Sequence, residues 1–117
     1  MKLSILVPVF NEEKTIVSVL KRINETKVEN IDYEIIVIND GSTDNTKKLL
    51  ENNNNLYSSL ISNNRNSGKG YSVKEGLKIS KGDYVIFQDA DLEYDPIEFK
   101  KFINVCSKFN ADVVLGS

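Results

Sequence analysis

Three carboxylates, spaced two residues apart, follow an apolar run near the end of the chain. Asp89, Asp91 and Glu93 come after Tyr84–Gln88, whose β-branched and aromatic residues are typical of a buried strand. If the extended backbone continues past Asp89, all three side chains point to the same side. Like charges repel, and Mg²⁺, Mn²⁺ or Ca²⁺ relieves that repulsion by binding carboxylate oxygens. This spacing predicts a metal site at the rim of a sheet, and a solvated acidic turn is equally consistent with these residues alone.

The composition excludes several classes of chemistry. The sequence contains no histidine, which excludes Ser-His-Asp catalysis, Cys-His catalysis and a histidine-ligated zinc site within this span. Any metal must therefore be bound mainly by oxygen. A net charge of -2 gives no reason to expect a nucleic-acid partner. With 117 residues, 40% of them hydrophobic, the chain has the size of one soluble domain with a real core.

Cysteine usage and the N-terminal sequence predict a cytoplasmic location. The single cysteine, Cys106, rules out an internal disulfide and suits a reducing compartment. The apolar run that begins at Leu3 is too short for a signal peptide and lacks a small-residue cleavage site. No segment reaches the apolar length that crosses a bilayer.

Apolar runs that suit strands alternate with segments of helical periodicity. This alternation predicts an α/β fold with a mostly parallel sheet and helices on both of its faces. The strands are expected in continuous apolar runs, which agree with burial on both sides. The expected strands are Leu3–Val9, Tyr33–Ile38, Leu56–Ser62, the run before Asp89 and Asp112–Gly116, and the expected helices lie around Ile16–Ile23, Thr46–Glu51, Val73–Ser80 and from Pro96 to Cys106.

Local signals suggest where these elements begin and end. Asn11 is the expected N-cap of the first helix, with Glu12 and Glu13 in the first turn, where the helix dipole favours negative charge. The asparagine run Asn52–Asn55 is expected to be a surface loop. Gly82 is the stop signal expected after the third helix.

The residues that could bind a ligand collect in the loops that leave the strands. The loops that enter strands, Glu29–Asp32 and Ser80–Asp83, have the composition of generic surface. In open α/β sheets, ligands bind outside the carboxyl ends of the strands. We therefore expect four loops to converge on one rim: Asn11–Glu12, Asp40–Ser42, Gly68–Gly70 and Asp89–Asp91.

The third of these loops does not match the common phosphate-binding motifs. A P-loop requires a glycine where Asn63 stands and Ser or Thr where Gly70 stands, and a dinucleotide fingerprint requires a glycine in place of Val73. The loop's glycines still allow backbone N–H groups to approach an anion at a helix N-terminus, and Lys69 adds a positive charge. A flexible surface turn is the alternative interpretation.

Three single residues on the same rim each have two interpretations. Asp40 ends an apolar run, where it either accepts hydrogen bonds from a base or a ribose or caps a turn. Phe10 either stacks on a planar base or belongs to the core. Glu12 either holds a polar ligand group or stabilises the N-terminus of the first helix.

Four segments, in this order, resemble the family 2 glycosyltransferases, and most closely the dolichol-phosphate mannose synthase-like enzymes. These segments are Pro8–Glu12, Val37–Thr46, Asn66–Gly70 and Gly82–Pro96. The resemblance implies the nucleotide-binding half of a GT-A fold, a Rossmann-like sheet flanked by helices. It also implies that residues 1–117 form a single nucleotide-sugar-binding domain, truncated at its C-terminal end, because members of the family continue well past this point.

The resemblance assigns roles to residues of the four segments. Asp40 matches the acid that bonds the base, and Asp89 and Ala90 match positions at the ribose and the diphosphate. Asp91 matches the metal ligand of the D-x-D motif, and Glu93 falls where the synthases often carry a glutamine ligand. The positions that meet the base and the ribose are matched by Pro8, Val9, Phe10 and Glu12.

Three positions depart from the family's usual residues. Asn39 stands in place of an aspartate, and Phe10 replaces a common tyrosine while keeping its stacking face. Glu93 in place of glutamine adds negative charge at the metal, which would alter metal preference.

The implied reaction is the transfer of a sugar, with inversion, from a UDP- or GDP-sugar to an acceptor, with Mg²⁺ or Mn²⁺ on the D-x-D motif. A polyprenyl phosphate at the cytoplasmic face of a membrane is the acceptor that the subgroup implies. Its phosphate oxygen is already anionic, so no general base is needed, and no catalytic residue is assigned. An uncapped final strand would favour a homodimer.

Two other functions are consistent with the same pattern. A phosphoacceptor receiver domain has a similar length and acids at strand ends, but it needs an acceptor aspartate after the third strand, where Ser62–Asn64 stands. The other is a fragment that binds a nucleotide without turnover.

Overall fold

The computed structural model describes residues 1–88, 90 and 113–115, and it confirms the predicted alternation of strands and helices. Asp89, Asp91, Glu93 and the helix expected from Pro96 to Cys106 lie outside the described residues. The elements are β1 (Lys2–Val9), α1 (Ile16–Glu25), β2 (Asp32–Asp40), α2 (Thr46–Asn52), the 3₁₀ turn η1 (Asn54–Leu56), β3 (Ser59–Asn63), α3 (Lys69–Ile79), β4 (Tyr84–Phe87) and β5 (Val113–Leu115).

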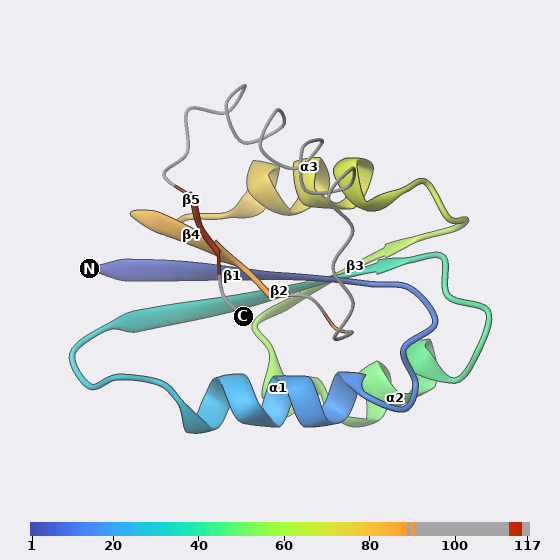
Figure 1. Cartoon of the computed structure of the whole chain (residues 1–117), viewed down its shortest axis with the longest axis horizontal. Coiled ribbons are helices and arrows are strands. Elements are labelled where there is room, and N and C mark those ends of the chain that lie inside the picture. Colours follow the sequence, from blue (N-terminus) through green and yellow to red (C-terminus); the bar gives the residue numbers. More distant parts are fainter. Residues whose placement is uncertain (89, 91–112, 116–117) are drawn as a thin grey trace.

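The described strands form one parallel sheet in the order β3-β2-β1-β4-β5. Helices α1 and α2 cover one face of the sheet and α3 covers the other, as predicted (Figure 1). From β1 the chain adds β2 and β3 on one side, whereas β4 lies on the other side of β1. The strand order therefore reverses between β1 and β4, and in open α/β sheets such a switch point is where ligands bind.

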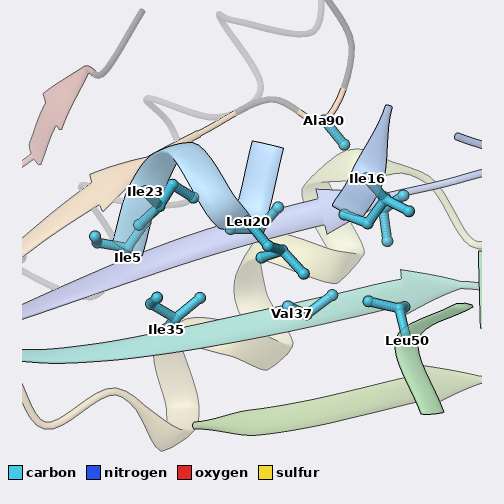
Figure 2. Packing of buried hydrophobic residues seen from close by; sticks show 10 residues of the cluster. Ile5, Ile16, Leu20, Ile23, Ile35, Val37, Leu50 and Ala90 are labelled. Carbon is cyan, nitrogen blue, oxygen red and sulfur yellow. The ribbon is translucent and has the colours of Figure 1, made fainter. Parts of the chain in front are cut away.

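Each central strand is apolar on both faces because each face is covered by helices. Ile5 of β1 points toward α1 and packs in one cluster with Ile16 and Leu20 (Figure 2), and Val7 belongs to the same cluster. Leu6, between them, points to the opposite face, where α3 packs. Successive strand residues alternate between faces, so a continuous apolar run serves two cores. Burial of each such side chain contributes about 1.5–3 kcal/mol to folding.

Two strand boundaries differ from the prediction by two residues or more. β2 continues two residues beyond Ile38, so that Asn39 and Asp40 are buried members of the sheet rather than part of a loop. β3 begins only at Ser59. The run predicted as the loop Asn52–Asn55 instead ends α2 and enters the 3₁₀ turn, which takes up the residues before β3.

The first helix begins later than predicted. α1 begins at Ile16, so Asn11 is not its N-cap, and Glu12 and Glu13 lie before its first turn. The physical reason is that the backbone N–H groups of residues 11–13 donate to side chains of the segment that follows β2. The backbone N–H of Glu12, for example, donates to the hydroxyl of Thr46 at 3.0 Å.

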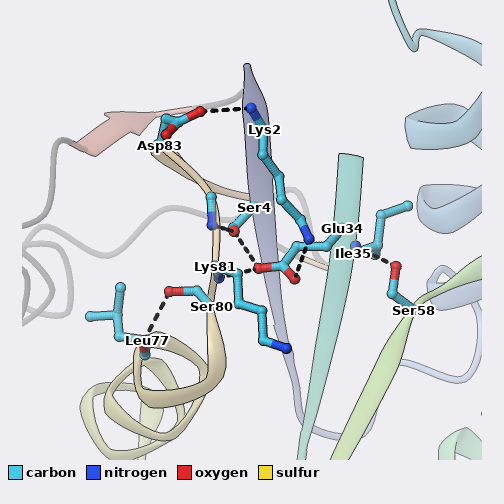
Figure 3. A network of polar contacts seen from close by, with 10 residues as sticks. Lys2, Ser4, Glu34, Ile35, Ser58, Leu77, Ser80, Lys81 and Asp83 are labelled. Atoms are coloured by element: carbon cyan, nitrogen blue, oxygen red, sulfur yellow. Dashed lines mark hydrogen bonds and ion pairs between the residues drawn. The ribbon is translucent and has the colours of Figure 1, made fainter. Parts of the chain in front are cut away.

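The segment Ser80–Asp83, predicted to be generic surface, is built into the amino edge of the sheet. Glu34 of β2 accepts hydrogen bonds, each 2.5 Å long, from the hydroxyl of Ser4 and the backbone N–H of Lys81 (Figure 3). The hydroxyl of Ser4 also accepts a bond from the N–H of Gly82 at 2.8 Å. This network holds the start of β4 against β1 and β2.

The same network explains why glycine stands at position 82. A Cβ atom there would lie 2.6 Å from the backbone nitrogen of Ser4, which is closer than real contacts allow. α3 has already ended at Ile79, so Gly82 allows a close approach of two strands and is not the stop signal of the helix. The backbone N–H of Lys2 completes the attachment by donating to Asp83 at 2.8 Å.

Candidate functional site

The loops that leave β1, β2 and β3 and the end of β4 are joined by hydrogen bonds at the carboxyl edge of the sheet (Figure 1). Asn11 links the first loop to the second, Asp40 links the second to the third, and Thr15 links the first to Ala90 after β4. The convergence of loops predicted from the sequence is thus confirmed for the described residues.

Asn11 joins the loop after β1 to the loop after β2. It adopts a φ of 51°, a left-handed conformation in which asparagine is enriched. Its backbone N–H donates to the hydroxyl of Ser42 at 3.0 Å. Its side-chain oxygen accepts the N–H groups of Thr43 and Asp44 at 2.7 and 3.3 Å. Since Asn11 follows Phe10 in the chain, these bonds fix the backbone from which the aromatic ring projects.

A second set of bonds ties the same two loops together at Glu13. The backbone N–H of Glu13 donates to the carboxylate of Asp44 at 3.4 Å, and the carboxylate of Glu13 accepts the N–H of Asn45 at 3.1 Å. Burial acts to raise the pKa of Asp44, but hydrogen bonds from Thr46 and from Glu13 outweigh it and hold that pKa below its usual value. Asp44 is therefore ionised near neutral pH and keeps the two loops joined.

Asp40 is a buried carboxylate that holds the loop between β3 and α3. It is 4% exposed. It accepts the backbone N–H groups of Ser67 and Gly68 at 2.9 and 2.8 Å and the side-chain amide of Asn63 at 2.9 Å. A carboxylate offers about four acceptor sites, so room for one further donor is left. Of the two interpretations of Asp40, its role as a cap of the turn is observed directly. A hydrogen bond from a nucleotide base to the same carboxylate is compatible with that role.

Gly41 allows the loops after β2 and β3 to touch. Its φ is 72°, and a Cβ atom at this position would lie 2.7 Å from the Cα atom of Arg65, with other backbone atoms of Arg65 and Asn66 closer still. The close backbone approach brings residues 65–68 within reach of the Asp40 carboxylate. Gly41 therefore contributes to the site by allowing these two loops to pack closely.

Phe10 and Val9, adjacent in sequence, differ sharply in exposure. Phe10 is 42% exposed at the rim, so it is not a core residue, and its ring is accessible to a planar ligand. Val9 is 3% exposed and its side chain packs in the core, which leaves only its backbone to meet a ligand. Pro8 is likewise buried within β1.

Lys69 is the first residue of α3, and Gly68 occupies the N-cap position. The glycine-containing segment thus leads into a helix N-terminus, as predicted, and the bonds from Ser67 and Gly68 to Asp40 hold it in place. It is neither a P-loop nor a flexible turn. Lys69 is partly buried and Arg65 is exposed.

Ala90 lies just beyond β4, on the opposite side of the switch point from the loop after β1. It is 3% exposed and packs in the same core cluster as Ile16 (Figure 2). Its carbonyl oxygen accepts a hydrogen bond of 2.6 Å from the hydroxyl of Thr15. This bond spans the switch point directly.

The predicted metal ligands cannot be placed, because Asp91, Glu93 and the neighbouring Asp89 lie outside the described residues. Within the described residues, no group of three acids or cysteines is suited to hold a metal ion. The metal site therefore stays a prediction.

Sequence reasoning missed Thr15 at this edge, and it placed Asn11 in a rim loop without finding its role in joining two loops. Thr15 carried no signal, since a threonine in a polar turn resembles ordinary surface. Asn11 carried one: an asparagine directly after a strand is a common choice for left-handed backbone. None of the described helices is long and apolar enough to cross a membrane.

A family model described as "Glycosyl transferase family 2" matches residues 4–117 of the chain. An undecaprenyl-phosphate 4-deoxy-4-formamido-L-arabinose transferase of Proteus mirabilis is 37% identical over 106 residues, which cover 87% of this chain and 32% of the transferase. A protein of Methanocaldococcus jannaschii is 35% identical over 120 residues, which cover 95% of this chain and 49% of that protein. The chain therefore spans about half or less of the length of these two curated relatives.

Two solved structures share the fold. S. aureus TarS 1-349 in complex with UDP-GlcNAc superposes with a TM-score of 0.70 at 28% identity, covering 92% of this chain and 32% of TarS 1-349. Glucosyl-3-phosphoglycerate synthase from Mycobacterium tuberculosis, with Mn²⁺, UDP and glucosyl-3-phosphoglycerate, gives a TM-score of 0.64 at 31% identity, covering 79% of this chain and 34% of the synthase.

Proposed function

Because the chain belongs to glycosyl transferase family 2, we propose that it binds a nucleotide-diphosphate sugar at the carboxyl edge of its sheet and serves the transfer of that sugar to an acceptor. The observation that carries the proposal is the hydrogen-bonded junction of the loops after β1, β2 and β3 with Ala90 at the topological switch point. Ligands of open α/β sheets bind at such a point.

The described part of the rim has suitable groups for a nucleotide. The exposed ring of Phe10 offers a stacking surface for a base, and Asp40 has acceptor capacity for a base N–H. Glu12, two residues after Phe10 in the loop that follows β1, offers a carboxylate to a ribose. Lys69, at the N-terminus of α3, adds positive charge for a phosphate.

We extend the site to the residues that follow β4. Asp89 and Ala90 would meet the ribose and the diphosphate, and Asp91 and Glu93 would hold Mg²⁺ or Mn²⁺. Carboxylate oxygens suit these hard ions, and the chain lacks histidine that would favour other metals. When bound, the ion would offset negative charge that develops on the diphosphate leaving group. A solved structure of a similar synthase contains Mn²⁺ together with UDP, which supports this part of the proposal.

The acceptor is proposed to be a polyprenyl phosphate, reached at a membrane surface. A similar transferase is named for undecaprenyl phosphate, and this supports a lipid phosphate over a protein or nucleic-acid acceptor. An anionic phosphate oxygen attacks the anomeric carbon from the face opposite the diphosphate, and the configuration inverts. This acceptor needs no general base. The narrower assignment to the dolichol-phosphate mannose synthase-like subgroup stands as part of the same proposal.

A nucleotide screen tests the donor half of this proposal. We expect UDP or GDP to raise the thermal unfolding temperature, and to raise it further with Mn²⁺, because a ligand that binds only the folded state stabilises it. ADP, whose base presents no ring N–H to a carboxylate, should stabilise less. No stabilisation by UDP or GDP, with or without Mn²⁺, would contradict the proposal.

A binding module that holds the nucleotide sugar without turnover is the second candidate. Release of UDP or GDP from the matching nucleotide sugar, measured with undecaprenyl phosphate present, separates the two. The receiver-domain interpretation is wrong: receivers have the strand order 2-1-3-4-5, and this sheet has the order 3-2-1-4-5. The expected homodimer stays a prediction, which light scattering would test.

A further inference from the structure

A hydrogen bond between Thr15 and Ala90 joins the loop after β1 to the end of β4. The hydroxyl of Thr15 lies 2.6 Å from the carbonyl oxygen of Ala90, although the two residues are 75 positions apart in sequence. This length is at the short end of the range for an O–H···O bond. The bond crosses the position where the strand order reverses.

Thr15 has one hydroxyl hydrogen and two acceptors within reach. Its oxygen is 2.6 Å from the Ala90 carbonyl and 3.3 Å from a carboxylate oxygen of Glu12. The shorter distance identifies the Ala90 carbonyl as the acceptor. Because threonine is branched at Cβ, few side-chain rotamers are open to it, and the hydroxyl direction is well defined by the backbone.

The backbone of Thr15 is itself held on both sides. Its N–H donates to the carbonyl of Glu12 at 3.1 Å, and its carbonyl accepts the N–H of Val19 at 2.9 Å, in the first turn of α1. The next residue, Ile16, is 0% exposed in the core cluster that also contains Ala90. The hydroxyl of Thr15 is thus held by a well-fixed part of the backbone. Its partner, the carbonyl of Ala90, belongs to a residue that is also packed in the core.

The Ala90 carbonyl belongs to the planar peptide unit that links Ala90 to Asp91. We propose that Thr15 is a positioning residue for the metal-binding segment, fixing this peptide unit so that the acids on either side of Ala90 can hold the cation and the nucleotide diphosphate together. This inference rests on the proposed function. Thr15 touches neither the metal nor the substrate in this account and acts only through the backbone of Ala90.

The test compares Thr15→Val, which keeps the branched shape and removes the hydroxyl, with Thr15→Ser, which keeps the hydroxyl. Each protein is titrated calorimetrically with UDP and with GDP, in the presence and absence of Mn²⁺. For Thr15→Val we expect the gain in nucleotide affinity that Mn²⁺ gives to fall by about tenfold. This is the smaller end of the loss, about 10–100-fold, seen when a residue that orients a metal ligand is replaced. Nucleotide affinity without Mn²⁺ should stay unchanged. Thr15→Ser should retain the wild-type gain.

Thr26→Val is the matched control. Thr26 stands at the other end of α1, where its hydroxyl also bonds backbone carbonyls, those of Arg22 and Ile23 at 3.0 and 3.1 Å. Its loss should leave the effect of Mn²⁺ unchanged. Thermal unfolding followed by circular dichroism shows whether each variant is folded at the assay temperature. If Thr15→Val is not, Thr15→Cys replaces it, because a thiol is a weak donor.

The outcomes separate this inference from the function on which it rests. If Mn²⁺ raises the nucleotide affinity of Thr15→Val as much as it raises that of the wild type, the positioning role is overturned and the proposed function stays intact. An equal loss of nucleotide affinity with and without Mn²⁺, not restored by Thr15→Ser, would also overturn it, since that result marks a merely structural residue. Failure of the wild-type chain to bind either nucleotide would overturn the proposed function and this inference with it.

Discussion

Replacing Asp40 with alanine should lower the free energy of unfolding by about 3 kcal/mol, because it removes three hydrogen bonds to a charged acceptor, each of which contributes about 1.5–3 kcal/mol. The N–H groups of Ser67 and Gly68 and the amide of Asn63 all donate to this one carboxylate. Water would satisfy some of them after the change, which keeps the total below the sum of three separate losses. Urea denaturation of the wild type and the variant measures the difference.

The same substitution should also abolish detectable nucleotide binding, because Asp40 organises the segment before α3 and is the proposed acceptor for a base N–H. Asp32→Ala is the matched control: it removes an exposed aspartate at the other end of the same strand. We expect it to change neither stability nor binding. An Asp40→Ala protein as stable as the Asp32→Ala protein would show that the three hydrogen bonds do not hold the loop.

Gly41→Ala should destabilise the fold by about 2–5 kcal/mol, since the left-handed backbone costs a non-glycine residue about 1–2 kcal/mol and overpacking adds about 1–3 kcal/mol. The added Cβ would meet the backbone of Arg65 and Asn66, with the Cα atom of Arg65 2.7 Å away. Backbone atoms cannot turn aside as a flexible side chain can. The loop carrying Ser67 and Gly68 would then be pushed away from Asp40.

Gly70→Ala separates this effect from the general consequences of replacing a glycine. Gly70 lies within α3, where an added Cβ would have no atom of the described residues within 4 Å beyond its chain neighbours and its own helix backbone. Alanine favours a helix over glycine by about 0.5–1 kcal/mol, so this change should be neutral or stabilising. Thermal unfolding of both variants is the measurement, and equal unfolding temperatures would contradict the assigned role of Gly41.

The sheet could be predicted from the sequence because its strands are apolar on both faces. Runs such as Tyr33–Ile38 stand out without knowledge of their neighbours, and their alternation with helical segments is enough to indicate parallel pairing. The ends of the strands were harder to predict. Asn39 and Asp40 are polar residues that resemble a loop, yet the sheet continues through them because their side chains accept hydrogen bonds from the loops after β2 and β3 and, for Asp40, from Asn63 of β3.

The position of the candidate site, at the carboxyl edge of the sheet, could be predicted from the sequence. The hydrogen bonds that build the site could not. That the loops leaving the strands share one edge follows from parallel pairing alone. The bonds that join these loops connect residues far apart in sequence, as Asn11 does with Ser42 and Thr15 with Ala90. No local pattern signals such pairs. The same holds at the opposite edge, where Glu34 accepts a hydrogen bond from Lys81 and ties the loop before β4 to β2.

The central claim is that a divalent cation joins the nucleotide diphosphate to the acids after β4, and Asp91→Ala tests it most directly. Calorimetric titrations with UDP and GDP, with and without Mn²⁺, are to be compared for the wild type, Asp91→Ala and the charge-matched control Asp32→Asn. We predict that Mn²⁺ raises the wild-type affinity for one nucleotide by at least about tenfold, or about 1.4 kcal/mol, and the control behaves alike. Asp91→Ala should show no gain from Mn²⁺. A gain in Asp91→Ala equal to that of the wild type would contradict the account.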